Sequence, residues 1–157
     1  MGKTLIISLA LLFVSFATAN AQLKMNIENS TGKVFYILQP GDPGYDAKIQ
    51  HGLIAYNTDL EDNHWRRGFQ WIEANELCKE LGKGWHLPNI DELNKLYQNR
   101  DMIGSFKDMT VHGLIKGLYW SSSEGDYSGA LAVDFRNGLQ DHHKEDLKLF
   151  VRAVRSF

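Results

Sequence analysis

The side chains best suited to catalysis or metal binding stand in patterns that support neither. His142 and His143 are adjacent, and adjacent residues of a strand point to opposite faces, so the pair cannot readily hold one ion. No group of cysteines and histidines has the spacing of a zinc site. Three successive serines, residues 121–123, lack the Gly-x-Ser-x-Gly elbow of a serine nucleophile. We therefore expect no catalytic residue, no metal ion and no cofactor.

Cys78 is the only cysteine, so no disulfide forms within the chain. Free cysteine is among the most frequently buried residue types, and we expect Cys78 to lie in the core. Trp71, Trp85 and Trp120 could stack on a sugar, but Trp71 and Trp120 lie in segments with core patterning. We expect these tryptophans to support the fold.

Trp65 differs from the other tryptophans because it lies in a polar run, residues 62–67, beside two arginines. An exposed aromatic ring next to guanidinium groups suits an anionic or glycan ligand. The alternative is that Trp65 covers the first helix.

Charge excludes two classes of partner. The formal net charge is −2, with 17 Lys+Arg against 19 Asp+Glu, and no basic run is longer than Arg66-Arg67. Nucleic-acid binding requires a concentrated positive patch, and electrostatic attachment to anionic lipid requires a polybasic segment. We expect neither partner.

The first 21 residues have the three-part layout of a secretion signal. Lys3 supplies the positive charge, an uncharged run covers residues 5–17, and Ala19 and Ala21 place small residues at the cleavage positions. The apolar run is shorter than the about 20 residues that span a bilayer. We expect cleavage after Ala21, with an uncleaved anchor as the alternative, and a single domain over residues 22–157 without a transmembrane helix. The protein is then exported to the periplasm, the cell surface or the medium.

The first half of this domain predicts a β-hairpin followed by two helices. β-branched and aromatic residues favour strands at 33–38 and 52–56, joined by a loop rich in proline and glycine. Apolar residues recur at intervals of three and four over 68–81, which predicts a helix. A second helix, 89–100, begins with Asn89 as the N-cap and Glu92 three residues later, the pattern of a capping box. Residues 101–117 are expected to form a loop.

The second half predicts a β region. Strands are expected at 118–122, 130–136 and 139–143, with Asn137-Gly138 marking the hairpin between the last two. A final strand is expected at 147–154; both of its faces are apolar, so the guanidinium of Arg152 should be buried. A buried charge must be paired, and we predict that Arg152 contacts a carboxylate, Glu92 or Asp134.

Six segments occur in one order along almost the whole of residues 22–157. They are Gly32-Lys33-Val34-Phe35-Tyr36, Gln50-His51-Gly52-Leu53-Ile54-Ala55, Trp85-His86-Leu87-Pro88 with Glu92-Leu93, Tyr119-Trp120-Ser121-Ser122-Ser123-Glu124, Phe135-Arg136-Asn137-Gly138 and Val151-Arg152-Ala153-Val154-Arg155. Together they resemble the bacterial Lcl C-terminal-like domain family, a domain of unknown function.

The resemblance implies an α+β domain of C-type-lectin-like fold, two helices packed on small antiparallel sheets, related to the formylglycine-generating enzyme. The calcium-binding triplets of lectins and the cysteine pair of that enzyme do not carry over to this sequence. The family's named member is an adhesin that binds sulfated glycans. By analogy we expect a non-catalytic binding module whose ligand is a glycan or a cell-envelope or protein surface. A structural component of a surface assembly and an uncharacterised enzyme of the fold are the alternatives.

The fold implied by the resemblance presents variable loops on a rigid scaffold, so binding is expected in loops 101–128 and 136–144. The residues expected to contact the ligand are Tyr119, Glu124, Asp126, Tyr127, Arg136, Asn137 and Trp65. The residues expected to support the fold are Trp71, Cys78, Trp85, Glu92, Trp120, Asp134 and Arg152.

Overall fold

The computed structural model describes residues 28–29, 31–61, 68–106, 117–126 and 129–157. The predicted signal peptide, Trp65 and Tyr127 lie outside these ranges, so their predicted roles stay predictions. No helix within the ranges is both long enough and apolar enough to cross a membrane.

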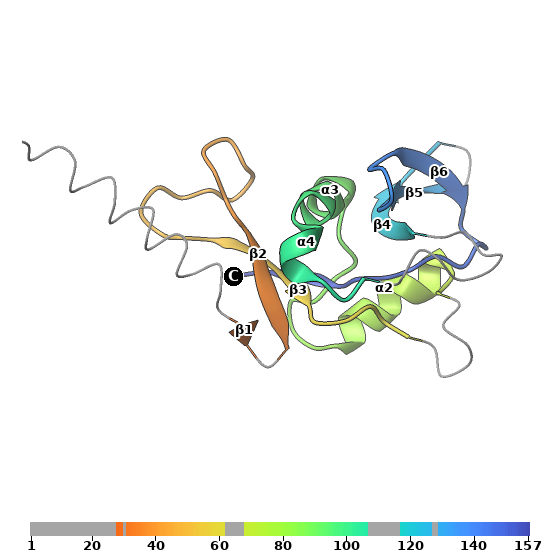
Figure 1. The fold of residues 1–157 in the computed structure, drawn as a ribbon, viewed down its shortest axis with the longest axis horizontal. Helices are drawn as coiled ribbons and strands as arrows, with labels where there is room; N and C mark the ends of the chain where they lie inside the picture. Colours follow the sequence, from red (N-terminus) through yellow and green to blue (C-terminus); the bar gives the residue numbers. More distant parts are fainter. Residues whose placement is uncertain (1–27, 30, 62–67, 107–116, 127–128) are drawn as a thin grey trace, which may run out of the picture.

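Two antiparallel sheets and three helices make up the described chain (Figure 1). The first sheet has the order β1-β2-β3-β7 and the second the order β4-β5-β6. The strands are β1 (Glu28–Asn29), β2 (Gly32–Ile37), β3 (Gly52–Tyr56), β4 (Leu118–Glu124), β5 (Gly129–Asp134), β6 (Gln140–Lys144) and β7 (Val154–Ser156). The helices are α2 (Trp71–Glu80), α3 (Ile90–Gln98) and α4 (Arg100–Ile103). The predicted α+β class is therefore confirmed.

Both predicted helices form, and capping sets where they begin. The Oδ1 of Asn89 accepts a hydrogen bond from the Glu92 N–H at 2.9 Å, and the Glu92 carboxylate accepts one from the Asn89 N–H at 2.9 Å. This reciprocal pair is the expected capping box. Helix α2 begins later than predicted, because Gly68 has φ +72° and cannot be helical. Part of the predicted loop 101–117 instead forms α4.

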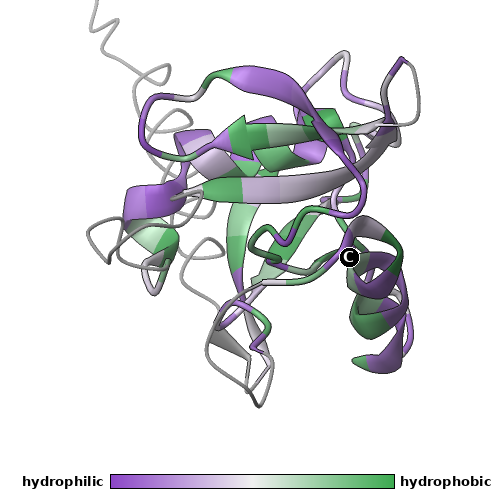
Figure 2. Cartoon of the chain, turned by 90° about the vertical axis from the view of Figure 1, so that its right-hand side faces the viewer, coloured by the Kyte–Doolittle hydropathy of each residue, from purple (hydrophilic) through white to green (hydrophobic). Residues whose placement is uncertain are grey.

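Two apolar clusters fill the interior, one against each of the longer helices. The α2-side core includes Ala74 and Cys78 of α2, and the α3-side core includes Leu93 and Leu96 of α3. Other buried members of the α2-side core include Trp85, Trp120, Leu149, Val151 and Ala153. Other buried members of the α3-side core include Phe35, Ile103, Tyr119, Val133, Phe135 and Val154. Hydrophobic and hydrophilic stretches accordingly mix within single elements, as Figure 2 shows.

The predicted strand at 147–154 is wrong in extent. Only Val154–Ser156 forms a strand, β7, and the residues before it cross from the second sheet to the first (Figure 1). On the way, Leu149 exchanges hydrogen bonds with Phe69, and Phe150 with β4, at 2.9–3.1 Å. Because the bonding partner changes along the segment, no continuous ladder forms. The predicted alternation still holds, since Val151 and Val154 enter opposite cores.

Candidate functional site

A buried charged network joins three parts of the chain around Arg152. Its side chain is 0% exposed, and its Nε donates to Asp59 Oδ1 at 2.7 Å. The two Nη atoms donate to the backbone carbonyls of Tyr56 and Ser105, at 3.1 and 2.6 Å. Asp59 also accepts a hydrogen bond from the Tyr119 hydroxyl at 2.8 Å. Arg152 is therefore buried and paired as predicted, but its partner is neither Glu92 nor Asp134.

Each of the two predicted partners already bonds a basic side chain that is close to it in the sequence. Glu92 bonds the ring of His86 at 3.1 Å. This bond raises the pKa of His86, against the lowering effect of burial. Burial alone would raise the pKa of Glu92, but the bonds from His86 and the Asn89 N–H outweigh it and lower that pKa. Asp134 is bonded by Arg136, which lowers the pKa of the Asp134 carboxyl.

The β5–β6 loop, residues 135–139, is exposed at its tip and fixed at its base. The carbonyl of Asp134 accepts from the N–H groups of Asn137 and Gly138, and the Asn137 Oδ1 accepts from the Leu139 N–H at 3.0 Å. The Asp134 carboxylate takes bonds from the Nε and one Nη of Arg136. The second Nη of Arg136 has no bonding partner in the described chain, and Leu139 is 67% exposed.

The predicted ligand-binding residues do not form one site. Arg136 and Asn137 lie beyond the end of the second sheet where Leu118 pairs with Asp134. Glu124 and Asp126 lie at the other end, about 15–20 Å away along six-residue strand β5. The prediction that Tyr119 contacts the ligand is wrong. Its side chain is fully buried and belongs to the α3-side core rather than to a binding surface.

Three tryptophans, Cys78 and Ser121 are packed or hydrogen-bonded within the fold, as expected of residues that support it. Trp85 and Trp120 are buried, and half-buried Trp71 donates to the Ser121 carbonyl at 2.7 Å. Burial raises the pKa of the Cys78 thiol to about 12. The Ser121 hydroxyl is buried and donates to the Leu131 carbonyl. Within the described ranges, no three His, Cys, Asp or Glu side chains gather as a metal site requires.

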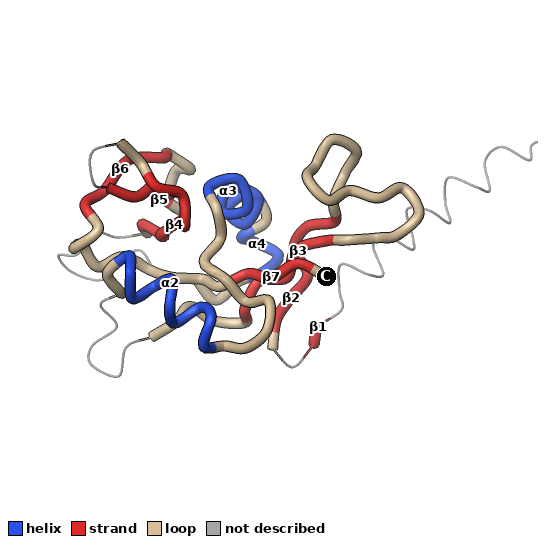
Figure 3. Tube along the Cα trace, turned by 180° about the vertical axis from the view of Figure 1, so that it is seen from behind, coloured by secondary structure: helices blue, strands red, loops and turns tan. Residues whose placement is uncertain are grey.

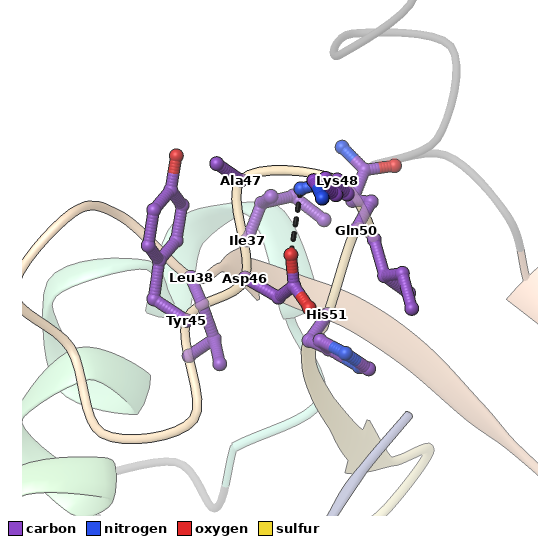
Figure 4. A pocket seen from close by; sticks show the side chains of 9 residues that line it. Ile37, Leu38, Tyr45, Asp46, Ala47, Lys48, Gln50 and His51 are labelled. Atoms are coloured by element: carbon purple, nitrogen blue, oxygen red, sulfur yellow. Dashed lines mark hydrogen bonds between the residues drawn. The ribbon is translucent and has the colours of Figure 1, made fainter.

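The long β2–β3 loop, residues 38–51, is a feature that the sequence analysis did not single out as a site. It projects from the first sheet, as the tan loop beside β2 and β3 in Figure 3. It borders a half-open cavity of about 270 Å³ lined by residues 37–38 and 45–51 (Figure 4). Its proline and glycine content predicted a turn but carried no sign of a cavity.

Asp42 ties the β2–β3 loop to the body of the domain. Its carboxylate accepts hydrogen bonds from the Gln39 N–H, the Tyr36 hydroxyl and the Lys95 ammonium, at 2.7, 2.8 and 2.9 Å. The Gln39 bond and then the Lys95 bond lower the Asp42 pKa from 3.8 to about 2. The loop thus gains an attachment to α3 that is strongest while Asp42 is ionised.

We predict that Asp42→Asn lowers the free energy of unfolding by about 1 kcal/mol near pH 7, because a partly exposed pair is screened by solvent. A carboxyl whose pKa is lowered on folding stabilises the native state above its unfolded pKa. That contribution disappears as the pH falls from about 4 to about 2. Urea unfolding of both proteins across this range measures the difference. Asp126→Asn, at an exposed residue, is the control, and a difference independent of pH would contradict the prediction.

These features together define a small α+β domain of two antiparallel sheets that presents a rigid exposed loop and a loop cavity, with its charged network buried. The model of the Lcl C-terminal domain matches residues 46–155, and the chain belongs to this family. The family predicted from the six segments is therefore confirmed. No curated protein matches the sequence.

Proposed function

We propose that the protein is an exported, non-catalytic binding module that recognises a glycan through the β5–β6 loop. The observation that carries the proposal is Arg136, whose guanidinium is held by Asp134 while its side chain stays 51% exposed. A guanidinium has five N–H donors in a fixed plane, so those that Asp134 leaves unused face the solvent in a set orientation. A preoriented donor loses little entropy on binding.

The neighbours of Arg136 complete a surface suited to a sugar. The Oδ1 of Asn137 accepts a hydrogen bond from the Leu139 N–H. The amino group of the same carboxamide is therefore left as a donor at the exposed tip of the loop. The exposed Leu139 side chain offers an apolar contact beside these donors. Donors and apolar surface side by side match the hydroxyls and C–H faces of a glycan.

The surroundings of the nucleophilic side chains support a role without catalysis. A thiol whose pKa is about 12 is protonated at neutral pH and is a poor nucleophile. Ser123 Oγ accepts a hydrogen bond from the Ile90 N–H, at the beginning of α3, which gives this serine a structural role. The predicted secretion signal is the basis for placing the protein outside the cytoplasm.

A glycan array probed with the purified protein tests the proposal. We expect a defined set of glycans to retain the protein, and Arg136→Gln to weaken retention at least tenfold, while Arg136→Lys weakens it less. Lys144→Gln removes an exposed charge at the opposite end of β6 and is the matched control. Absence of retention by any glycan would overturn the proposal. Co-purification of an envelope protein in its place would favour the structural alternative.

A further inference from the structure

One residue that lines the cavity of the β2–β3 loop has a buried side-chain acceptor that nothing in the described chain satisfies. Within the described chain, three buried side-chain atoms lack a hydrogen-bond partner: Gln50 Oε1, His143 Nε2 and Arg155 Nε. Gln50 is the one of the three that lines this cavity. Buried acceptors are normally hydrogen-bonded, so this atom calls for a donor that the described chain does not supply.

The other walls of the cavity supply an aromatic face and further polar groups. Figure 4 shows Tyr45 standing to one side of Ala47 and Gln50 to the other. The Tyr45 ring is 40% exposed, and the ammonium of exposed Lys48 has no acidic partner in the described chain. His51 Nδ1 bonds the Phe157 carbonyl at 3.1 Å, which requires a proton on Nδ1. In the neutral ring, Nε2 is then an acceptor.

The loop around the cavity is held in place before any ligand arrives. Asp42 anchors one arm to α3 through Lys95. The Leu38 N–H donates to the His51 carbonyl at 2.9 Å and closes the base of the loop. The Lys48 N–H donates to Asp46 Oδ1 at 2.7 Å, the dashed line of Figure 4. A preformed cavity avoids the entropy cost of ordering a loop on binding.

The unpaired oxygen of Gln50 restricts which classes of ligand can bind in the cavity, because the ligand must donate a hydrogen bond to it. A purely apolar ligand would leave Oε1 unpaired, and a sulfate or carboxylate ion has no proton to offer it. A hydroxyl can donate to Gln50 Oε1 or His51 Nε2 and can also accept from Lys48. The negative face of the Tyr45 ring attracts weakly positive C–H groups, such as those on one face of a pyranose.

We propose that this cavity binds a single pyranose unit, with a hydroxyl donating to Gln50 Oε1 and a ring face packed on Tyr45. The volume of about 270 Å³ is smaller than the usual drug-sized site and suits one sugar ring. The site is separate from the β5–β6 loop, because it lies in a connection of the first sheet, whereas that loop joins two strands of the second sheet (Figure 1). The inference therefore goes beyond the proposed function.

The test is a titration of the ¹⁵N-labelled protein with methyl glucoside, methyl galactoside and methyl mannoside, followed by NMR. We expect one of these to shift the side-chain amide of Gln50 with a dissociation constant in the millimolar range, as befits a small ligand. Sodium sulfate, which has no donor, should leave that amide unshifted. No shift with any of the three glycosides would overturn the proposal.

Gln50→Met removes the acceptor while keeping the length of the side chain. Because Oε1 is unpaired in the protein, this variant should melt at the same temperature as the native protein or higher, yet bind the sugar at least tenfold more weakly. Gln140→Met, at an exposed glutamine of β6, is the matched control and should change neither property. Unchanged binding by Gln50→Met, or a lowered melting temperature, would overturn the proposed role of the oxygen.

Tyr45→Ser tests the proposed site through a second residue. The variant should fold normally, because Tyr45 lies in an exposed stretch of loop outside both cores. This variant should bind the same sugar at least tenfold more weakly, and its melting temperature should equal that of the native protein. Arg136→Gln should leave this titration unchanged. Failure at the cavity is thereby distinguished from failure of the β5–β6 loop.

Discussion

Arg152→Met is expected to lower the free energy of unfolding by about 3–5 kcal/mol, the usual cost of removing one partner of a buried ion pair. Both side chains of the Arg152–Asp59 pair are 0% exposed. Methionine fills much of the arginine's volume, so the loss is mainly electrostatic. The Asp59 carboxylate would keep its bond from Tyr119 but lose the charge of Arg152, and the carbonyls of Tyr56 and Ser105 would lose the hydrogen bonds from its guanidinium. Urea unfolding followed by circular dichroism measures the change.

The double variant Asp59→Asn/Arg152→Met separates the pairing from the packing. Asparagine keeps an oxygen that accepts a hydrogen bond from the Tyr119 hydroxyl. It carries no charge, so no unpaired charge is left in the core when Arg152 is replaced. The double variant should therefore be clearly more stable than the sum of the two single losses implies. Lys79→Met breaks the exposed pair with Glu76 and should cost little. Simple additivity, or an Arg152→Met loss as small as that of Lys79→Met, would contradict the prediction.

The partner of Arg152 shows where sequence reasoning stops. Burial and pairing followed from an arginine within two apolar strand faces, and the structure has both. The predicted partner was wrong because Glu92 and Asp134 each bond a basic side chain within six residues, His86 and Arg136. Asp59 is 93 residues from Arg152 and lies outside any strand or helix. A loop carboxylate has no periodicity that would indicate its burial.

Local patterns predicted the elements well because their causes are local. The capping box of α3, the extent of β3 and the hairpin after β5 depend on residues only a few positions apart. The segment before β7 was misjudged because its backbone bonds to Phe69, β4 and β3 in turn. Burial on both sides resembles a strand in the sequence, and only the tertiary arrangement decides whether a ladder forms.

The candidate site was less accessible to sequence reasoning than the fold. Arg136 and Asn137 were found because a hairpin signal places them in an exposed loop. Tyr119 was misplaced because strand alternation does not say which face meets the solvent when helices and sheets cover both. The cavity beside Gln50 depends on how a 14-residue loop, 38–51, folds back on itself. No residue pattern indicates that.

The second large effect is expected from Gly68→Ala, at the junction between α2 and the crossing C-terminal segment. Gly68 has φ +72°, a conformation that costs a residue with a Cβ about 1–2 kcal/mol. An added Cβ would also lie 2.5 Å from the carbonyl carbon of Leu149 and closer still to its oxygen. Backbone atoms cannot rotate away, and forced overpacking typically costs about 1–3 kcal/mol more. The predicted loss is therefore about 3 kcal/mol.

Gly84→Ala separates the two causes of this loss. Gly84 also has a positive φ, +87°, but an added Cβ there meets no atom within 4 Å. It should therefore show the conformational cost alone, and the excess in Gly68→Ala measures the clash with Leu149. That clash would also disturb Trp120, whose Nε1 donates to the carbonyl of Phe69 at 2.9 Å. Near-ultraviolet circular dichroism should change in Gly68→Ala and not in Gly84→Ala, and equal losses in both variants would contradict the close approach at Leu149.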